Sequence, residues 1–151
     1  MKLDNTLSAL QQLISRCETC VLYEPLLDEI DYRDDSFPIE IRTDNLVLPN
    51  DKDNDPSDWA GRCITKFKSI KTYVLIPGTR FDTHGTRYGK GGGWYDRFLS
   101  QIPIDWLRIG VADKSQISNT KLPRQKWDEP VEWLIVRDSF AWNVYKTDDH
   151  L

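Results

Sequence analysis

The residues with the clearest chemical potential lie in the stretch RYGKGGGWYDR, residues 87–97. Four of the chain's eight glycines fall between Gly89 and Gly93, with Lys90 among them. Glycines let backbone amides reach a ligand because no Cβ stands in the way, and nearby cations can neutralise an anion. A helix expected from Trp94 would add the unpaired amides of its first turn. The pattern therefore favours a phosphate site over the alternative, a flexible surface loop with solvated cations.

This stretch fits neither common phosphate-binding template. A Walker A loop needs Ser or Thr after its Gly-Lys pair, and here Gly91 follows Lys90. A dinucleotide fingerprint joins strand to helix by a tight turn, whereas residues 77–93 show no convincing helix or strand. So long a connection in a compact domain is usually functional. The pattern alone predicts a polyphosphate site of unassigned type.

Alternating helix and strand patterns surround this loop. Apolar residues at helical spacing between Leu7 and Cys17 predict a helix, and a second helix is expected from Trp94. Short apolar runs predict five strands, at residues 20–25, 46–48, 72–76, 107–112 and 133–136. Residues 39–42 show weaker strand character. Residues 51–59 are interpreted as a solvated acidic loop. The alternation predicts an α/β fold with a mostly parallel sheet. Ligands gather at the carboxyl ends of parallel strands, where the loop after Ile76 is expected.

Composition narrows the class of protein. With 151 residues, of which 39% are hydrophobic and 29% charged, the chain is expected to form one domain over residues 1–151. It shows no apolar run that could span a bilayer and no secretory signal, so we expect a cytoplasmic protein without a membrane partner. A net charge of -4 argues against a nucleic-acid partner, but leaves room for a small anionic ligand.

The cysteines carry a weak metal signal. Cys17 and Cys20 have the spacing of half a zinc site, but no second pair follows and both histidines lie far away in sequence. An odd number of cysteines in a cytoplasmic chain, here three with Cys63, favours reduced thiols. We therefore expect no zinc site.

A longer stretch, IPGTRFDTHGTRYGKGGGWYDRFL, resembles the signature of the 5-formyltetrahydrofolate cyclo-ligase family, PGxxFDxxGxRxGxGxGYYDRFL. The positions in register are Pro77, Gly78, Phe81, Asp82, Gly85, Arg87, Gly89, Gly91, Gly93, Tyr95, Asp96, Arg97, Phe98 and Leu99. IGVADKSQ, LPRQKWDEPVEWLIV and, upstream, VLYEPLLDEID are also similar to the family. The resemblance implies a single three-layer α/β/α domain with a mostly parallel sheet, of the NagB/RpiA/CoA-transferase-like kind.

The resemblance also implies a reaction. Members of the family use MgATP to close 5-formyltetrahydrofolate to 5,10-methenyltetrahydrofolate, releasing ADP and phosphate. The formyl oxygen attacks the γ-phosphate of ATP, and N10 then attacks the activated carbon. Phosphoryl transfer of this kind needs positioning and charge neutralisation more than a covalent nucleophile.

Site residues follow from the same resemblance. ATP would be bound by Gly89, Lys90, Gly91, Gly92, Gly93, Trp94 and Asp96. The catalytic residues would be Arg87, Lys90 and Tyr95, and the folate would be bound by Glu29, Trp94 and Tyr95. Asp96 would hold Mg²⁺, directly or through water. Each assignment has an alternative: Asp96 as a carboxylate complementing the helix dipole, Trp94 as a core residue, and Glu29 as a surface charge.

The chain also departs from the family. Members usually begin with an additional basic helix that reaches the ATP phosphates, whereas this chain begins at what resembles their second helix. The segment between Glu29 and Leu46 is shorter than theirs, and Trp127 replaces a His. We therefore expect a shortened, divergent member.

Two functions are compatible with these observations. One is an ATP-dependent cyclo-ligase acting on 5-formyltetrahydrofolate or a related folate, as a monomer or homodimer. The other is a catalytically inactive or repurposed paralog that binds folate or a nucleotide. A third, an acyl or CoA-type ligand, would rest on fold analogy alone.

Overall fold

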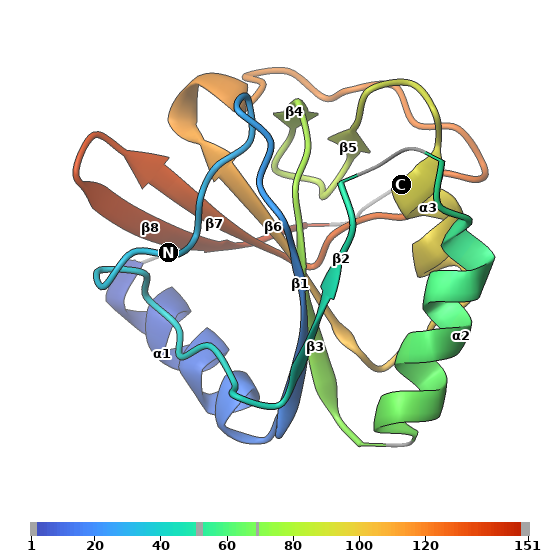
Figure 1. Ribbon diagram of the computed structural model, residues 1–151. Helices are drawn as coiled ribbons and strands as arrows, with labels where there is room; N and C mark the ends of the chain where they lie inside the picture. Colours follow the sequence, from blue (N-terminus) through green and yellow to red (C-terminus); the bar gives the residue numbers. More distant parts are fainter. Residues whose placement is uncertain (1–2, 51–52, 69, 149–151) are drawn as a thin grey trace.

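A six-stranded sheet runs through the molecule, with helices on both faces (Figure 1). The computed structural model describes residues 3–50, 53–68 and 70–148. In chain order the elements are α1 (Leu3–Ser15), β1 (Thr19–Tyr23), β2 (Asn45–Leu48), α2 (Pro56–Phe67), β3 (Thr72–Ile76), β4 (Arg80–Phe81), β5 (Arg87–Tyr88), α3 (Trp94–Leu99), β6 (Leu107–Asp113), β7 (Trp133–Asp138) and β8 (Ala141–Lys146).

The sheet has the strand order β2-β1-β3-β6-β7-β8. All neighbouring strands pair in parallel except β7 and β8, which are antiparallel. The predicted α/β fold with a mostly parallel sheet is therefore confirmed. The sequence analysis missed β8, in which only Val144 is buried and polar residues interrupt the apolar ones, so that no apolar run marks the strand.

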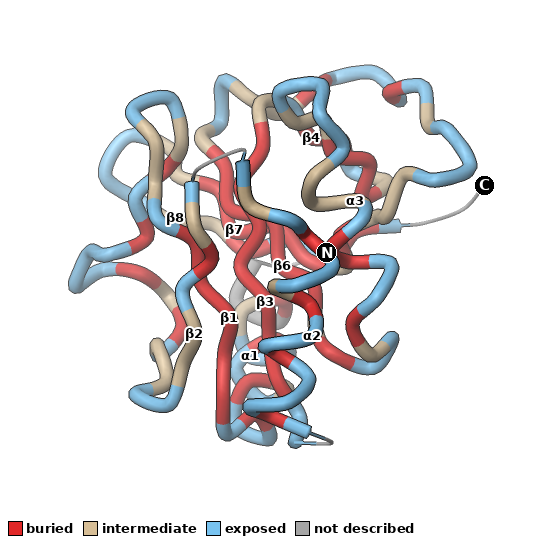
Figure 2. The backbone as a smooth tube through the Cα atoms, turned by 45° about the vertical axis from the view of Figure 1, so that its right-hand side comes forward, coloured by how far each residue is buried: buried red, intermediate tan, exposed pale blue. Residues whose placement is uncertain are grey.

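Each face of the sheet has its own core. One core joins α1 and residues 24–44 to the sheet, and the other joins α2 and α3 to it. Strands β1 and β3 are buried at every residue, as Figure 2 shows by their continuous red. This is the burial expected of a parallel sheet covered on both sides. Cys17, Cys20 and Cys63 are buried in these cores as unpaired cysteines. None of the described helices is long and apolar enough to cross a membrane.

Helix α2 begins inside the stretch that was interpreted as a solvated acidic loop. Asp55 is its N-cap, and the Asp55 side chain accepts a hydrogen bond from the Ser57 amide at 2.9 Å. Pro56 occupies the first helical turn, where its missing N–H costs nothing. The loop interpretation was therefore wrong from residue 56 onward, because the acidic residues include a helix cap.

The strand predicted at residues 39–42 does not form. This segment is held instead by hydrogen bonds from side chains to its backbone carbonyls: Tyr73 donates to Glu40, and Asn45 donates to Arg42. Ile39 is buried in the core beside α1. Side chains thus satisfy backbone groups that a neighbouring strand would otherwise pair.

The long connection between β3 and α3 contains a hairpin that the sequence analysis missed. Strands β4 and β5 pair antiparallel, with Phe81 opposite Arg87. Buried Asp82 closes the hairpin: one carboxylate oxygen accepts hydrogen bonds from the His84 and Thr86 amides, and the other accepts one from Leu122 at 2.7 Å. The hairpin and the connection leading to β7 are therefore tied together at the carboxyl end of the sheet.

Replacing Asp82 by Ala should lower the free energy of unfolding by about 3 kcal/mol or more, because three amides would lose a charged acceptor and two lie in a buried setting. Urea denaturation monitored by circular dichroism measures this. Asp105→Ala, at an exposed position, is the matched control and should change stability by less than about 0.5 kcal/mol. Equal stability of the two variants would contradict the role assigned to Asp82.

Candidate functional site

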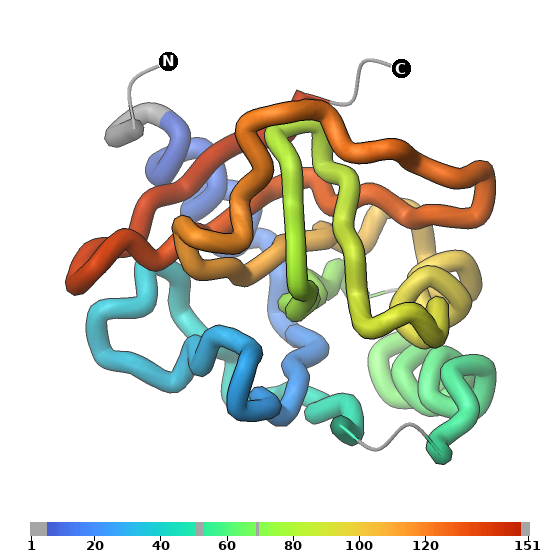
Figure 3. The backbone as a smooth tube through the Cα atoms, turned by 90° about the horizontal axis from the view of Figure 1, so that it is seen from above, coloured from blue at the N-terminus to red at the C-terminus, as the bar shows by residue number. Residues whose placement is uncertain are grey.

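A pocket of about 580 Å³ opens at the carboxyl ends of the strands. Its floor is the glycine-rich loop, residues 89–93, and the start of α3. One wall comes from residues 24–29 and 49–50, and the other from residues 123–128. Figure 3 shows these walls on opposite sides of the yellow-green loop, the first in blue and teal and the second in orange. The volume is typical of a small-molecule site.

Arg87 lies at the base of the pocket and is only 8% exposed. Its Nε donates a hydrogen bond to the Pro77 carbonyl, directly after β3. Its guanidinium also packs over the Tyr95 ring, with 4.8 Å from Cζ to the ring centroid. Burial lowers the pKa of Arg87 from its ordinary value, but an arginine remains charged at neutral pH. The pocket therefore has a fixed positive charge beneath it.

The four positions of the loop require glycine for different physical reasons, or not at all. Gly91 and Gly93 have positive φ angles of 94° and 66°, which side chains rarely adopt. A Cβ on Gly89 would lie 2.9 Å from an Arg87 guanidinium nitrogen, so this glycine makes room for the buried arginine. A Cβ on Gly92 would meet no described atom within 4 Å. Within the described structure, Gly92 alone of the four faces no conformational or steric demand from the protein.

Gly91→Ala should therefore lower the free energy of unfolding by about 1 to 2 kcal/mol, because alanine is strained at this φ. Gly92→Ala is the matched variant one residue away, and we expect it to stay within about 0.5 kcal/mol of the wild type. Thermal and urea unfolding of both variants measure the difference. A Gly92→Ala protein as unstable as Gly91→Ala would show that Gly92 has a structural role after all.

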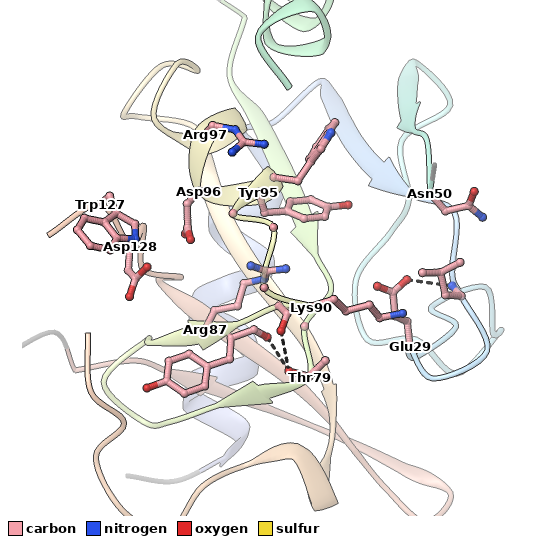
Figure 4. A pocket seen from close by; sticks show the side chains of 18 of the residues that line it. Glu29, Asn50, Thr79, Arg87, Lys90, Tyr95, Asp96, Arg97, Trp127 and Asp128 are labelled. Carbon is pink, nitrogen blue, oxygen red and sulfur yellow. Dashed lines mark hydrogen bonds between the residues drawn. The ribbon is translucent and has the colours of Figure 1, made fainter. Parts of the chain in front are cut away.

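Lys90 and Glu29 lie on the side of the pocket formed by residues 24–29, and Figure 4 shows the Lys90 side chain extending toward Glu29. Lys90 Nζ donates a hydrogen bond to Asp28 Oδ1 at 2.8 Å. This bond lowers the pKa of Asp28 below its ordinary value. Glu29 Oε1 accepts a hydrogen bond from the Leu26 amide at 2.9 Å, which fixes the carboxylate at the pocket wall. A cation and a carboxylate therefore stand next to each other here.

Two carboxylates face each other on the opposite side. Asp96, in the first turn of α3, accepts a hydrogen bond from the Glu129 amide at 3.0 Å. Burial and the neighbouring Asp128 raise the pKa of Asp96, while the Glu129 amide and Arg87 act in the opposite direction. Both side chains point into the pocket in Figure 4. Mg²⁺ is commonly held by one or two carboxylates together with substrate phosphates, so this pair fits a magnesium ion.

The raised pKa of Asp96 predicts that this residue lowers the stability of the fold by an amount that depends on pH. A carboxyl group that binds its proton more tightly when folded stabilises the protein at low pH, and that stability is lost as pH rises through the folded pKa. Asp96→Asn removes this loss and keeps a side-chain acceptor for the Glu129 amide. The variant should be more stable than the wild type at pH 7, with the difference shrinking toward pH 4. Melting temperatures across this range measure it; a constant difference would contradict the assignment.

Two aromatic side chains, Trp94 and Tyr95, line the pocket at the start of α3. Trp94 stacks on Phe98, with 5.6 Å between ring centroids, and its Nε1 donates a hydrogen bond to the Asn54 carbonyl. Trp94 is therefore partly a core residue, as its alternative interpretation held, although it also lines the pocket. The Tyr95 ring lies beside the Arg87 guanidinium, and both residues line the pocket (Figure 4). Burial raises the pKa of Tyr95, so its hydroxyl is neutral at ordinary pH.

The structure brings every predicted site residue to this one pocket. Its lining includes Glu29, Arg87, Gly89, Lys90, Gly91, Gly92, Gly93, Trp94, Tyr95 and Asp96. Their roles toward ligands stay predictions. The sequence analysis gave no role to Asp128, although its position in WDEP, within the segment resembling the family's last motif, was a usable signal. It also missed Thr79, whose hydroxyl donates to the Tyr88 and Gly89 carbonyls where the loop begins.

Comparison with known proteins places the chain in a family. The sequence model of the 5-formyltetrahydrofolate cyclo-ligase family matches residues 61–137, just over half of the chain. The chain belongs to this family. The matched region includes the glycine loop, α3 and the wall that carries Asp128.

Individual relatives agree with this family. The 5-formyltetrahydrofolate cyclo-ligase of Escherichia coli K12 is 35% identical over 74 residues, 46% of this chain and 37% of that protein. The chain thus matches little more than a third of that relative's length. The cyclo-ligase of Mycoplasma pneumoniae is 28% identical over 123 residues, 80% of this chain and 73% of that protein. A solved 5,10-methenyltetrahydrofolate synthetase from Mycoplasma pneumoniae shares the fold, with a TM-score of 0.56, 22% identity, and coverage of 89% of this chain and 83% of that one.

Proposed function

We propose that the protein closes 5-formyltetrahydrofolate to 5,10-methenyltetrahydrofolate in an ATP-dependent reaction that releases ADP and phosphate. The observation that carries this proposal is the pocket itself. It joins an unobstructed glycine loop, a buried arginine, a lysine and two carboxylates in the region that matches the family. Phosphoryl transfer depends on positioning and on neutralising the charge of the transferred group, and groups of these kinds provide both. The proposal takes residues 1–151 as one cyclo-ligase-like domain.

The glycine loop would hold the triphosphate. A Cβ on Gly91 or Gly92 would meet no described atom within 4 Å, and the nearest atom for Gly93 is an Arg97 guanidinium nitrogen at 3.9 Å. The first turn of α3 receives no hydrogen bond from a capping side chain among the described residues. Arg87 would stabilise the negative charge from below, and Lys90 would leave Asp28 for the phosphate that is transferred. Because Lys90 would exchange the Asp28 carboxylate for a phosphate, its ammonium group would keep an anionic hydrogen-bond partner as it moves.

Mg²⁺ would be held by Asp96 and Asp128 together with phosphate oxygens. When bound, the ion neutralises charge on the phosphates and orients them. It would also favour the ionised form of Asp96, whose pKa is raised in its absence. The protein's own contribution is to hold both carboxylates on the pocket wall through the backbone amides of Glu129 and Gln125.

The folate would occupy the side of the pocket formed by residues 24–29 and 49–50. A carboxylate such as Glu29 can accept two hydrogen bonds from the N–H groups of a pterin ring. The Tyr95 ring packs on the buried arginine, and its neutral hydroxyl would donate a hydrogen bond to the formyl oxygen. In this arrangement the formyl group of the substrate would lie beside Lys90, where the γ-phosphate is expected.

The proposal is tested by mixing the purified protein with 5-formyltetrahydrofolate and MgATP and following methenyltetrahydrofolate by its near-ultraviolet absorbance. Product should form only with ATP, and Lys90→Ala should lower kcat/KM roughly 100-fold or more, because a transition-state charge loses its partner. Lys66→Ala is the matched control: Lys66 also pairs with an exposed aspartate, Asp44, and its loss should change the rate less than about twofold.

Other outcomes of this assay separate the candidate functions. Absence of product, with ATP or folate still raising the melting temperature, would contradict the enzymatic proposal and favour the binding paralog. Absence of both product and ligand-induced stabilisation would exclude both functions. Arg87→Ala is a poor test of catalysis, because removing a buried, hydrogen-bonded arginine would also unfold its surroundings.

A further inference from the structure

Trp127 stands on the rim of the pocket with 69% of its surface exposed. It is one of two residues at the tip of a turn whose ends are closed by two hydrogen bonds. The Asp128 amide donates to the Gln125 carbonyl at 3.1 Å, and the Gln125 amide donates to the Asp128 carboxylate at 2.8 Å. The Glu129 amide then ties this turn to Asp96 on α3. The backbone beneath Trp127 is therefore fixed relative to the carboxylate pair.

The aromatic rings of the pocket differ in how much of each is already engaged. One face of Trp94 is taken by Phe98, and one face of Tyr95 by the Arg87 guanidinium. Among the described residues, no ring or cation packs on Trp127, and its indole nitrogen has no hydrogen-bond partner. Its π-face is thus free for a planar ligand, and aromatic side chains commonly bind nucleobases by stacking.

The direction of a bound triphosphate decides which ligand reaches this ring. Figure 4 shows Trp127 and Asp128 on one side of the cavity, Glu29 and Asn50 on the opposite side, and Arg87, Lys90 and Tyr95 between them. With the folate against Glu29 and the γ-phosphate near Lys90, the remaining phosphates extend past Asp96 and Asp128. The nucleoside would then leave the pocket on the side where Trp127 stands.

We propose that Trp127 stacks on the base of the bound nucleotide. This contact makes the protein bind ATP more tightly than it binds a triphosphate chain without a nucleoside. This inference rests on the proposed function, since it takes ATP as the phosphoryl donor. Stacking does not depend on hydrogen bonds to the edge of the base, so Trp127 contributes to binding of purine nucleotides in general. The glycine loop and Arg87 hold the phosphates, and Trp127 holds the other end of the molecule.

Calorimetric titration of the purified protein with MgATP and with magnesium tripolyphosphate separates these two contributions. Trp127→Ala should weaken MgATP binding at least about fivefold and leave tripolyphosphate binding unchanged. Trp127→Phe, which keeps an aromatic face, should stay within about twofold of the wild type for both ligands. Phe140→Ala is the matched control, because Phe140 is a fully exposed aromatic in the turn between β7 and β8, and it should change neither affinity.

Three results would overturn the inference. Unchanged MgATP affinity in Trp127→Ala would show that the ring does not contact the nucleotide. Equal losses for MgATP and tripolyphosphate would show that Trp127 acts on the phosphate site. If the wild type binds neither MgATP nor tripolyphosphate, the proposed function fails first, and the inference fails with it.

Discussion

Burial of the Arg87 guanidinium is the constraint on which the site depends. A cation removed from water must be compensated by hydrogen bonds and nearby electron density, and here the Pro77 carbonyl and the Tyr95 ring provide both. These partners belong to the end of β3 and to α3. The Arg87 side chain, from β5, therefore holds in place both the end of β3 and the start of α3, the two elements on either side of the glycine loop. It also leaves no room for a side chain at residue 89.

The density of glycines in the loop has several causes. Backbone conformation accounts for Gly91 and Gly93, and the packing of Arg87 accounts for Gly89. Only Gly92 needs an explanation outside the chain, and a phosphate lying against its amide is one. A glycine-rich motif is thus partly a structural requirement of its own fold. A bound ligand would explain the remaining glycine, Gly92, because a side chain there would occupy the space that the ligand needs.

Strand runs and the glycine loop were predictable because they depend on local patterns. Continuous apolar stretches such as residues 72–76 are typical of strands in a sheet covered on both faces. The missed features involve partners distant in sequence: the Leu122 amide donates to Asp82 and ties the hairpin to a later connection, and the Tyr73 hydroxyl donates to the Glu40 carbonyl. Similarly, Asp96 was recognisable within its motif, whereas its pairing with Asp128 exists only after β6 and β7 bring the two segments together.

The central claim is that the amides of the glycine loop hold the phosphates of ATP. Selective ¹⁵N-glycine labelling would give one backbone signal for each of the eight glycines, and titration with MgATP would test the claim directly. The account predicts that the signals of Gly91, Gly92 and Gly93 move on binding, while those of Gly61 in α2 and Gly110 in β6 stay unchanged. Saturable binding of MgATP with unmoved signals from the three loop glycines would contradict it.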